Sequence, residues 1–210
     1  MSMALELYGA QTGNCLRVAV ALEELGLPYA THKLDLGGGE HRREPFLALN
    51  PDGRVPVLVD RSDPDNPLVI AQSNAILLHL CDLQPGVLLP VDDIPARAIV
   101  LERFFYFVTD VIAANFSAFF LNRTGASPQA AEQFSARSID GIASAERFLA
   151  KSRYMAGDTF SLADVVAVTI VNASRDKIDW AGHCLLSRWF EDVGQRPAVL
   201  RGMQAFTVIN

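Results

Sequence analysis

Strand-like segments occur only in the first third of this chain, and this asymmetry limits the folds that it can adopt. Short apolar runs bounded by glycine or turn residues lie at 5–8, 29–36, 55–60 and 68–70. After them, the apolar positions recur only at helical spacing. Residues 84–95 (QPGVLLPVDDIP) contain three prolines and a glycine, a composition typical of a linker. The pattern predicts an α/β domain followed by an all-helical domain.

The α/β part has the order β-α-β, a connecting segment and then β-β-α. Its first helix begins near Asn14, carries Cys15, Val18 and Leu22 on one face, and ends at Gly26. A β-α-β crossover favours two parallel strands, and the turn-rich RSDPDNP segment makes a hairpin of the last two. This order predicts a thioredoxin-like domain over residues 1–83, a linker over 84–95 and an all-helical domain over 96–210.

The helical part is expected to contain helices at 96–121, 127–151, 161–177, 183–194 and 197–206. Ser161 and Asp164 have the spacing of a capping box, and Phe160 and Val165 the spacing of a hydrophobic staple. We therefore assign Asp164 a structural role and no catalytic one.

Composition argues against several classes of function. The net charge is −6 and no basic run occurs, which disfavours binding to nucleic acid. The start MSMALELYGA does not resemble a signal peptide, and the stretch 165–171 is far shorter than the roughly 20 residues that span a bilayer. Three widely spaced cysteines form neither a disulfide framework nor a zinc pattern. We expect a cytoplasmic protein with no metal, nucleic acid or membrane partner.

Val55-Pro56 is the first candidate for a binding element. A proline has no N–H for a strand ladder, so it stands at a strand start or edge. In a thioredoxin-like domain such a bond is commonly cis, which leaves the backbone of Val55 free to pair with an extended peptide. The alternative is a trans proline that only begins the strand. We predict the cis form.

Two helix starts are further candidates. Ser73 is expected to be the N-cap of the helix after the hairpin, where Gln72 and the helix terminus could also hold a carboxylate. In the turn before the first helix, Thr12 and Asn14 bring a hydroxyl and an amide to a positive helix terminus, which favours a thiolate. The alternative for each is a simple helix cap. Cys15 lies on the core face of its helix, and a buried cysteine is usually inert.

Together these pieces resemble the glutathione transferases over essentially the whole chain. LYGAQTGNCLRVAVALEELGLPYATHKLDL is similar to the family's first strand, helix and second strand, and NPDGRVPVLVD to its cis-proline strand. AQSNAILLHL resembles the helix that binds the γ-glutamyl group, GDTFSLADVV the folding motif of the helical domain, and RWFEDVGQRPAVLRGM the C-terminal end. Within the family the chain most resembles the nu class, although Gly13 stands where that class has proline.

The resemblance implies a glutathione site and an activity. Val55 would pair with the cysteinyl unit of glutathione, Gln72 and Ser73 would hold the γ-glutamyl end, and His41 and Arg54 would lie near the glycyl carboxylate. The implied function is a glutathione transferase or glutathione-dependent disulfide-bond reductase, which attacks a small electrophile or disulfide and serves detoxification. The alternative is a non-catalytic interaction module of the same fold. The polar residues of the glutathione site favour the enzyme.

Four side chains could contact the sulfur of glutathione, namely those of Tyr8, Thr12, Asn14 and Cys15. We predict that Thr12 and Asn14 are the catalytic pair, because two donors and the helix terminus each favour the charged form. Family resemblance also implies a homodimer, for which the aromatic run Phe104–Phe107 would supply apolar surface.

Overall fold

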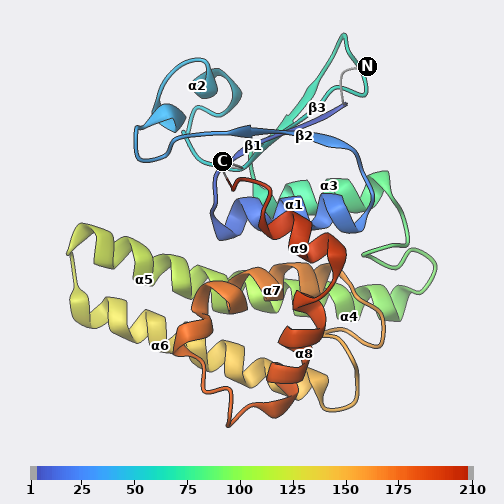
Figure 1. The fold of residues 1–210 in the computed structure, drawn as a ribbon, viewed down its shortest axis with the longest axis vertical. Coiled ribbons are helices and arrows are strands. Elements are labelled where there is room, and N and C mark those ends of the chain that lie inside the picture. The colour runs from blue at the N-terminus through green and yellow to red at the C-terminus, as the bar shows by residue number, and fades with distance from the viewer. Residues whose placement is uncertain (1–3, 208–210) are drawn as a thin grey trace. The chain divides into compact units, whose positions relative to one another are not determined.

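The computed structural model describes residues 4–207, which form two compact units (Figure 1). One unit contains the residues up to Leu88 together with the segment from Arg196 onward, and the other spans Leu89–Gln195. From the sequence we predict that this last segment belongs to the helical domain. Instead, its described part belongs to the N-terminal unit, because it packs on the first helix of that unit.

A four-stranded mixed sheet with the order β2-β1-β3-β4 forms the centre of the N-terminal unit. The strands are β1 (Leu5–Gly9), β2 (Tyr29–Lys33), β3 (Val57–Asp60) and β4 (Leu68–Ile70). β1 pairs with β2 in parallel and with β3 in antiparallel orientation, and β4 pairs antiparallel with β3. This topology confirms the predicted thioredoxin-like fold. β2 and β3 are shorter than the apolar runs that predicted them.

Helices cover both faces of this sheet. On one face lie α1 (Gly13–Glu24), α3 (Ser73–Leu83) and α9 (Pro197–Met203), and on the other lie η1 (Glu40–Arg42) and α2 (Phe46–Leu49) (Figure 1). Leu5 and Leu7 of β1 are buried toward the first face, as strand alternation requires. Tyr8 points to the second face, where it packs against a cluster formed by Phe46, Val57 and Val59.

The C-terminal segment is tightly bound to α1. An ideal Cβ on Gly202 would lie 2.5 Å from the Cα of Val20, so only glycine permits this approach. Arg196 donates two hydrogen bonds of 2.7 Å to the carboxylate of Glu24. The ring of Phe206, which is 1% exposed, lies next to Gly9 at the end of β1.

Helices and the loops that join them make up the described residues of the second unit, which contain one isolated β-bridge, between Tyr154 and Gly157. Its elements are α4 (Ile94–Phe105), the π-helical η2 (Tyr106–Ile112), α5 (Ala113–Thr124), α6 (Pro128–Ser144), η3 (Ala145–Leu149), α7 (Leu162–Ser174), η4 (Arg175–Lys177) and α8 (Cys184–Gly194). The predicted capping box is confirmed at the start of α7. Asp164 is fully buried and accepts hydrogen bonds from the backbone of Met155, from Ser161 and from the Trp189 indole, which fits a structural role.

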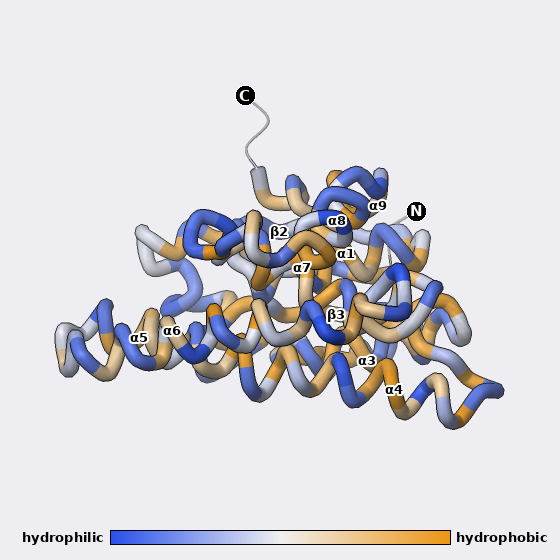
Figure 2. Tube along the Cα trace, turned by 90° about the horizontal axis from the view of Figure 1, so that it is seen from below, coloured by the Kyte–Doolittle hydropathy of each residue, from blue (hydrophilic) through white to orange (hydrophobic). Residues whose placement is uncertain are grey.

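The helical stretch Ile94–Thr124 is long and apolar enough to cross a membrane, by length and composition alone. The sequence alone predicts no such span, on the ground that residues 165–171 are its most apolar helical stretch. Core helices of water-soluble proteins, which are mostly buried, meet the same test, whereas the apolar window here is 28% buried. Polar positions recur along α4 and α5 (Figure 2). The expectation of no membrane partner therefore stays a prediction.

The aromatic run at the end of α4 supplies less surface than expected. Phe104 and Phe107 are fully buried within the chain, and only Phe105 of the three phenylalanines is largely exposed. The large exposed aromatic side chains lie instead along α5, at Phe116, Phe119 and Phe120. Phe104 and Phe107 therefore do not supply the surface predicted of them, because their three-residue spacing places both on the inward face of the helix. The homodimer itself stays a prediction.

The close approach of α9 to α1 leads to a prediction about stability. Replacing Gly202 with alanine forces a methyl group into the backbone of Val20, which should destabilise the protein by about 1–3 kcal/mol. Gly194→Ala is the matched control, since its Cβ would meet no atom within 4 Å. Chemical denaturation of both variants measures the effect. Equal stabilities would show that the backbones can separate without cost.

Candidate functional site

The sheet topology brings four chain segments to one end of the N-terminal unit. Tyr8, near the end of β1, pairs with Val57 at the start of β3, so the turn after β1 lies beside Val55. Ile70, at the end of β4, pairs with Leu58, so the start of α3 comes to the same edge. The backbone N–H of Leu34 donates to the carbonyl of Gly9, which adds the segment after β2.

Thr12 and Asn14 stand at the start of α1, within this edge. Thr12 is the N-cap by backbone conformation, but its side chain makes no capping hydrogen bond. Its hydroxyl donates to the Sγ of Cys15 at 3.1 Å instead. The half-buried Asn14 side chain has no hydrogen-bond partner within residues 4–207. Neither side chain serves as a simple cap. The Asn14 amide is available to a ligand, and the Thr12 hydroxyl can donate to one when it gives up its bond to Cys15.

Cys15 itself is fully buried, as predicted from its face of the helix. Burial raises the pKa of its thiol, although hydrogen bonds from Thr12 and from the backbone of Ala10 act in the opposite direction. A buried thiol with a raised pKa is a poor nucleophile.

Tyr8 is directed away from this turn. Its hydroxyl donates to the carboxylate of Glu6 at 3.0 Å, and its ring stacks on His32 with centroids 4.3 Å apart. Burial and the bond to Glu6 raise the pKa of Tyr8. The hydroxyl of Tyr8 therefore lies on the second face of the sheet, in a small polar group that also includes Arg61.

The Val55-Pro56 peptide bond is cis, which confirms the prediction. Within residues 4–207 the backbone N–H and C=O of Val55 take part in no backbone hydrogen bond. Asn50, which is 5% exposed, holds the preceding turn: its amide donates to the carbonyl of Arg54 at 2.7 Å and its oxygen accepts from the N–H of Asp52. The backbone N–H and C=O of Val55 are thus held in place by the preceding turn and remain unpaired.

The loop that carries His41 packs against this same turn. Gly53 has a φ of 58°, and an ideal Cβ there would lie 2.6 Å from the carbonyl oxygen of His41, so both its conformation and its surroundings require glycine. The Nδ1 of His41 is buried and has no partner within the described residues. Arg54 is exposed. The loop of His41 thus lies against the turn that precedes Arg54 and Val55, and the role of these residues toward a glycyl carboxylate stays a prediction. Glu44-Pro45 is a second cis bond, which the sequence did not indicate.

The start of α3 differs by one residue from the expectation. Gln72 rather than Ser73 is the N-cap, because Gln72 has extended backbone angles and its side chain accepts from the N–H of Asn74. Ser73 is the first helical residue, is buried, and donates to Gln72 at 3.5 Å. Apart from the N–H of Asn74, which donates to Gln72, the backbone N–H groups of this helix start remain available to an anion.

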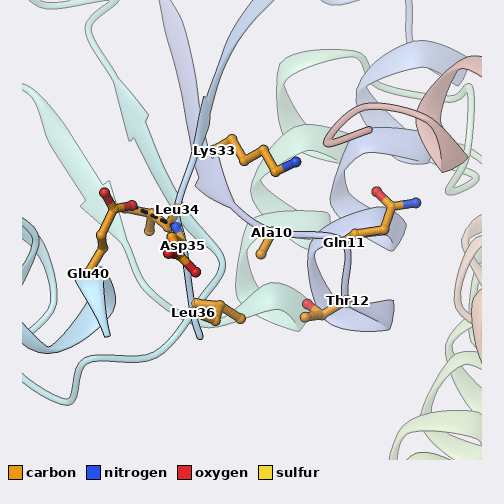
Figure 3. A pocket seen from close by; sticks show the side chains of 8 residues that line it. All are labelled: Ala10, Gln11, Thr12, Lys33, Leu34, Asp35, Leu36 and Glu40. Carbon is orange, nitrogen blue, oxygen red and sulfur yellow. Dashed lines mark hydrogen bonds between the residues drawn. The ribbon is translucent and has the colours of Figure 1, made fainter. Parts of the chain in front are cut away.

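A cavity of about 580 Å³ opens beside the start of α1 (Figure 3). It is lined by Ala10, Gln11, Thr12, Lys33, Leu34, Asp35, Leu36 and Glu40. Thr12 and Leu36 lie across from each other, and the Lys33 ammonium points toward Gln11 (Figure 3). Thr12 is the one predicted site residue in this lining.

Sequence reasoning missed two kinds of residue here. Lys33, Asp35 and Glu40 line the cavity, but nothing in their spacing indicates that two loops meet around them. Asn50 was missed although it stands in an Asn-Pro-Asp-Gly turn, where its side chain often bonds the backbone two residues on. Groups of histidine, cysteine and carboxylate side chains able to hold a metal are absent from the described residues.

The fold and the site define a thioredoxin-like protein with an unpaired backbone edge for a peptide-like ligand and with polar groups at two helix starts. The family model for the glutathione S-transferase N-terminal domain matches residues 13–83. Disulfide-bond oxidoreductase YfcG of Escherichia coli (strain K12) is 31% identical over 199 residues, covering 92% of this chain and 92% of the relative. Glutathione S-transferase GstB of the same strain is 30% identical over 192 residues, covering 89% of this chain and 90% of the relative. The chain belongs to the glutathione S-transferase family.

Solved structures agree with this fold. A glutathione transferase from Burkholderia graminis, with two glutathione molecules bound per subunit, is 24% identical and has a TM-score of 0.85. It covers 98% of this chain, which covers 89% of it. A glutathione transferase from Pseudomonas putida, with one glutathione disulfide bound per subunit, is 23% identical and has a TM-score of 0.84 over 96% of this chain and 91% of its own.

The turn before Val55 leads to a second prediction. Asn50→Ala removes one donor and one acceptor from a buried position, which should destabilise the protein by about 1–3 kcal/mol. Asn66→Ala, in the exposed hairpin loop, is the control and should change stability by less than about 0.5 kcal/mol. Thermal unfolding of the two variants compares them. A loss no larger than that of the control would mean that the Arg54 carbonyl needs no internal donor.

Proposed function

We propose that this protein binds glutathione at the edge formed by Thr12, Val55 and Ser73 and stabilises its thiolate for attack on a small electrophile or disulfide. One observation carries the proposal: the unpaired backbone of Val55 lies at the same end of the sheet as Thr12 and Asn14, whose side chains do not cap the start of α1. A tripeptide with a central thiol matches this arrangement, since its backbone pairs with Val55 while its side chain reaches the helix start.

The two ends of glutathione fit the remaining residues. The γ-glutamyl carboxylate accepts from backbone N–H groups at the start of α3, an 11-residue helix, beside Gln72 and Ser73. The glycyl carboxylate lies near Arg54 and near the unpartnered Nδ1 of His41. Both carboxylates thus meet donors that the protein itself leaves unused.

The chemistry starts from the ionised thiol. A free thiol has a pKa of about 8.5, and hydrogen bonds to its charged form lower this value. The Thr12 hydroxyl and the Asn14 amide supply these bonds, with Thr12 the larger contributor because hydroxyl donors bond at shorter distance. The thiol proton leaves to solvent. The thiolate attacks one sulfur of a disulfide, which forms a mixed disulfide and expels the other sulfur as a thiolate that takes up a proton. A second glutathione thiolate then attacks the glutathione sulfur of the mixed disulfide, which forms glutathione disulfide and releases the second thiol.

Disulfide reduction is favoured over conjugation by the relatives. YfcG and YghU of Escherichia coli are named disulfide-bond oxidoreductases, and the P. putida structure holds glutathione disulfide. GstB is named a glutathione S-transferase, which keeps conjugation and a role in detoxification as the second candidate. A non-catalytic interaction module is disfavoured, because such a module has no need for polar side chains at Thr12 and Asn14 that do not cap the helix.

We further propose that the protein is a cytoplasmic homodimer without a membrane or nucleic-acid partner. The net charge of −6 and three widely spaced cysteines support the compartment. The exposed rings of Phe116, Phe119 and Phe120 follow one another at helical spacing on α5 and support association. Their exposed fractions are 53%, 57% and 55%. Three such rings close together on one helix form an apolar patch, whereas single exposed apolar residues are common on any protein surface.

Glutathione-agarose retention, followed by parallel assays with a small disulfide and an aromatic halide, tests the function. We expect glutathione-dependent turnover of the disulfide, with a kcat about ten- to a hundredfold lower in Thr12→Ala, a smaller loss in Asn14→Ala, and no loss in Tyr8→Phe. Tyr8→Phe is the matched control because it also deletes one hydroxyl. If Tyr8→Phe alone abolished turnover, the assignment of the sulfur site would be wrong.

Light scattering tests the homodimer. At micromolar concentration the mass should be about twice the 22.9 kDa of one chain, and Phe119→Glu should lower it by placing a charge in the apolar surface of α5. Leu200→Glu changes an exposed residue of α9 in the same way and serves as the control. A mass near 22.9 kDa for the unmodified protein would contradict the proposal.

A further inference from the structure

The buried thiol of Cys15 touches both ends of the turn that carries Thr12. Its Sγ accepts a hydrogen bond from the Thr12 hydroxyl at 3.1 Å and one from the backbone N–H of Ala10 at 3.5 Å. Gly9 closes the other side, since an ideal Cβ there would lie 2.9 Å from the same sulfur and 2.8 Å from the ring of Phe206. The thiol is therefore fully buried and closely surrounded beside Thr12.

This contact fixes the direction of the Thr12 hydroxyl. A hydroxyl has one hydrogen to donate, and here the hydrogen points inward to Cys15. Thr12 also lines the cavity, so its oxygen lone pairs are the part of the group that a ligand meets first. The same hydrogen cannot serve Cys15 and a bound thiolate at once.

A bound thiolate should take the hydrogen from Cys15. Hydrogen bonds to a charged acceptor are roughly twice as strong as those to a neutral one. Rotation about the Cβ–Oγ bond of Thr12 redirects the hydrogen without moving the oxygen. After this rotation the Sγ of Cys15 still lies next to the Thr12 oxygen, but it no longer accepts a hydrogen bond from it.

Cys15 can reverse its role because it keeps its own hydrogen. Burial raises the pKa of this thiol, so it stays protonated at neutral pH. An S–H group is a weak donor as well as a weak acceptor. Once the Thr12 hydrogen has turned away, the S–H can donate to the Thr12 oxygen. This exchange of hydrogen bonds involves no proton transfer.

We propose that Cys15 is a positioning residue for Thr12, accepting its hydrogen bond in the free protein and donating to its oxygen when glutathione thiolate is bound. The proposal rests on the proposed function, in which Thr12 faces the sulfur of glutathione. Donation from Cys15 polarises the Thr12 hydroxyl toward the thiolate, because successive hydrogen bonds strengthen one another. Cys15 acts through Thr12 and has no contact with the substrate.

Cys15→Ala and Cys15→Ser separate this role from core packing. Alanine removes both the acceptor and the donor, whereas serine keeps both in a smaller group. Cys81→Ala is the matched control, since Cys81 is a second buried cysteine of the same unit, on α3. For each protein we would measure kcat and KM for glutathione with a small disulfide, the ultraviolet absorbance of bound thiolate at neutral pH, and the melting temperature.

We expect Cys15→Ala to lower kcat by about three- to tenfold, with less bound thiolate and a KM for glutathione within about twofold of the unmodified protein. Cys15→Ser should recover most of both signals. Cys81→Ala should change the melting temperature only. A normal kcat in Cys15→Ala would overturn the positioning role alone. The same conclusion would follow if Cys15→Ala and Cys15→Ser lost kcat equally and in proportion to their fall in melting temperature. An unmodified protein without glutathione turnover would overturn the proposed function and this role with it.

Discussion

The N-terminal unit depends on the close packing of the C-terminal segment against α1. Gly202 allows the two backbones to meet at Val20, and the ring of Phe206 lies against Gly9 at the end of β1. Gln11 donates to the carbonyl of Met203, which lies 192 positions later in the chain. The turn between β1 and α1 is therefore supported from behind, and a hydroxyl on that turn keeps one position relative to the sheet.

A second support comes from the opposite side of the site. The buried amide of Asn50 holds the Arg54 carbonyl, and Gly53 lets the loop of His41 approach the same turn. Val55 consequently keeps an unpaired backbone edge in a fixed place. Ligand contacts made by backbone atoms need such rigidity, because no side-chain rotamer can compensate for a displaced strand. One support acts on the turn of Thr12, and the other acts on the turn before Val55.

Much of this was accessible from the sequence, for reasons that particular residues make clear. Gly26 marks the end of α1 because it adopts a φ of 64°, a conformation that favours glycine. Pro28 and Pro56 restrict their own backbone, so Pro28 prevents the helix from resuming and Pro56 marks the start of β3. The packing of α9 on α1 was not accessible, since helical periodicity gives no partner. The same limit explains why the cavity residues Lys33 and Glu40 were missed: they come from loops that meet only in the folded chain. Asn50 is different, because its side chain bonds only within its own turn, and the Asn-Pro-Asp-Gly sequence could have indicated its role.

Strand alternation explains why the hydroxyl at the proposed sulfur site comes from a turn and not from β1. Leu5 and Leu7 face the helices of the buried side, so Tyr8 must face the other side, where Glu6 and His32 receive it. Turning Tyr8 toward the site would require a shift of one residue, which would expose Leu7. Thr12, beyond the end of the strand, is free of this constraint. The core of β1 thus restricts the chemistry to the turn, and Cys15 beneath that turn sets the direction of its hydroxyl.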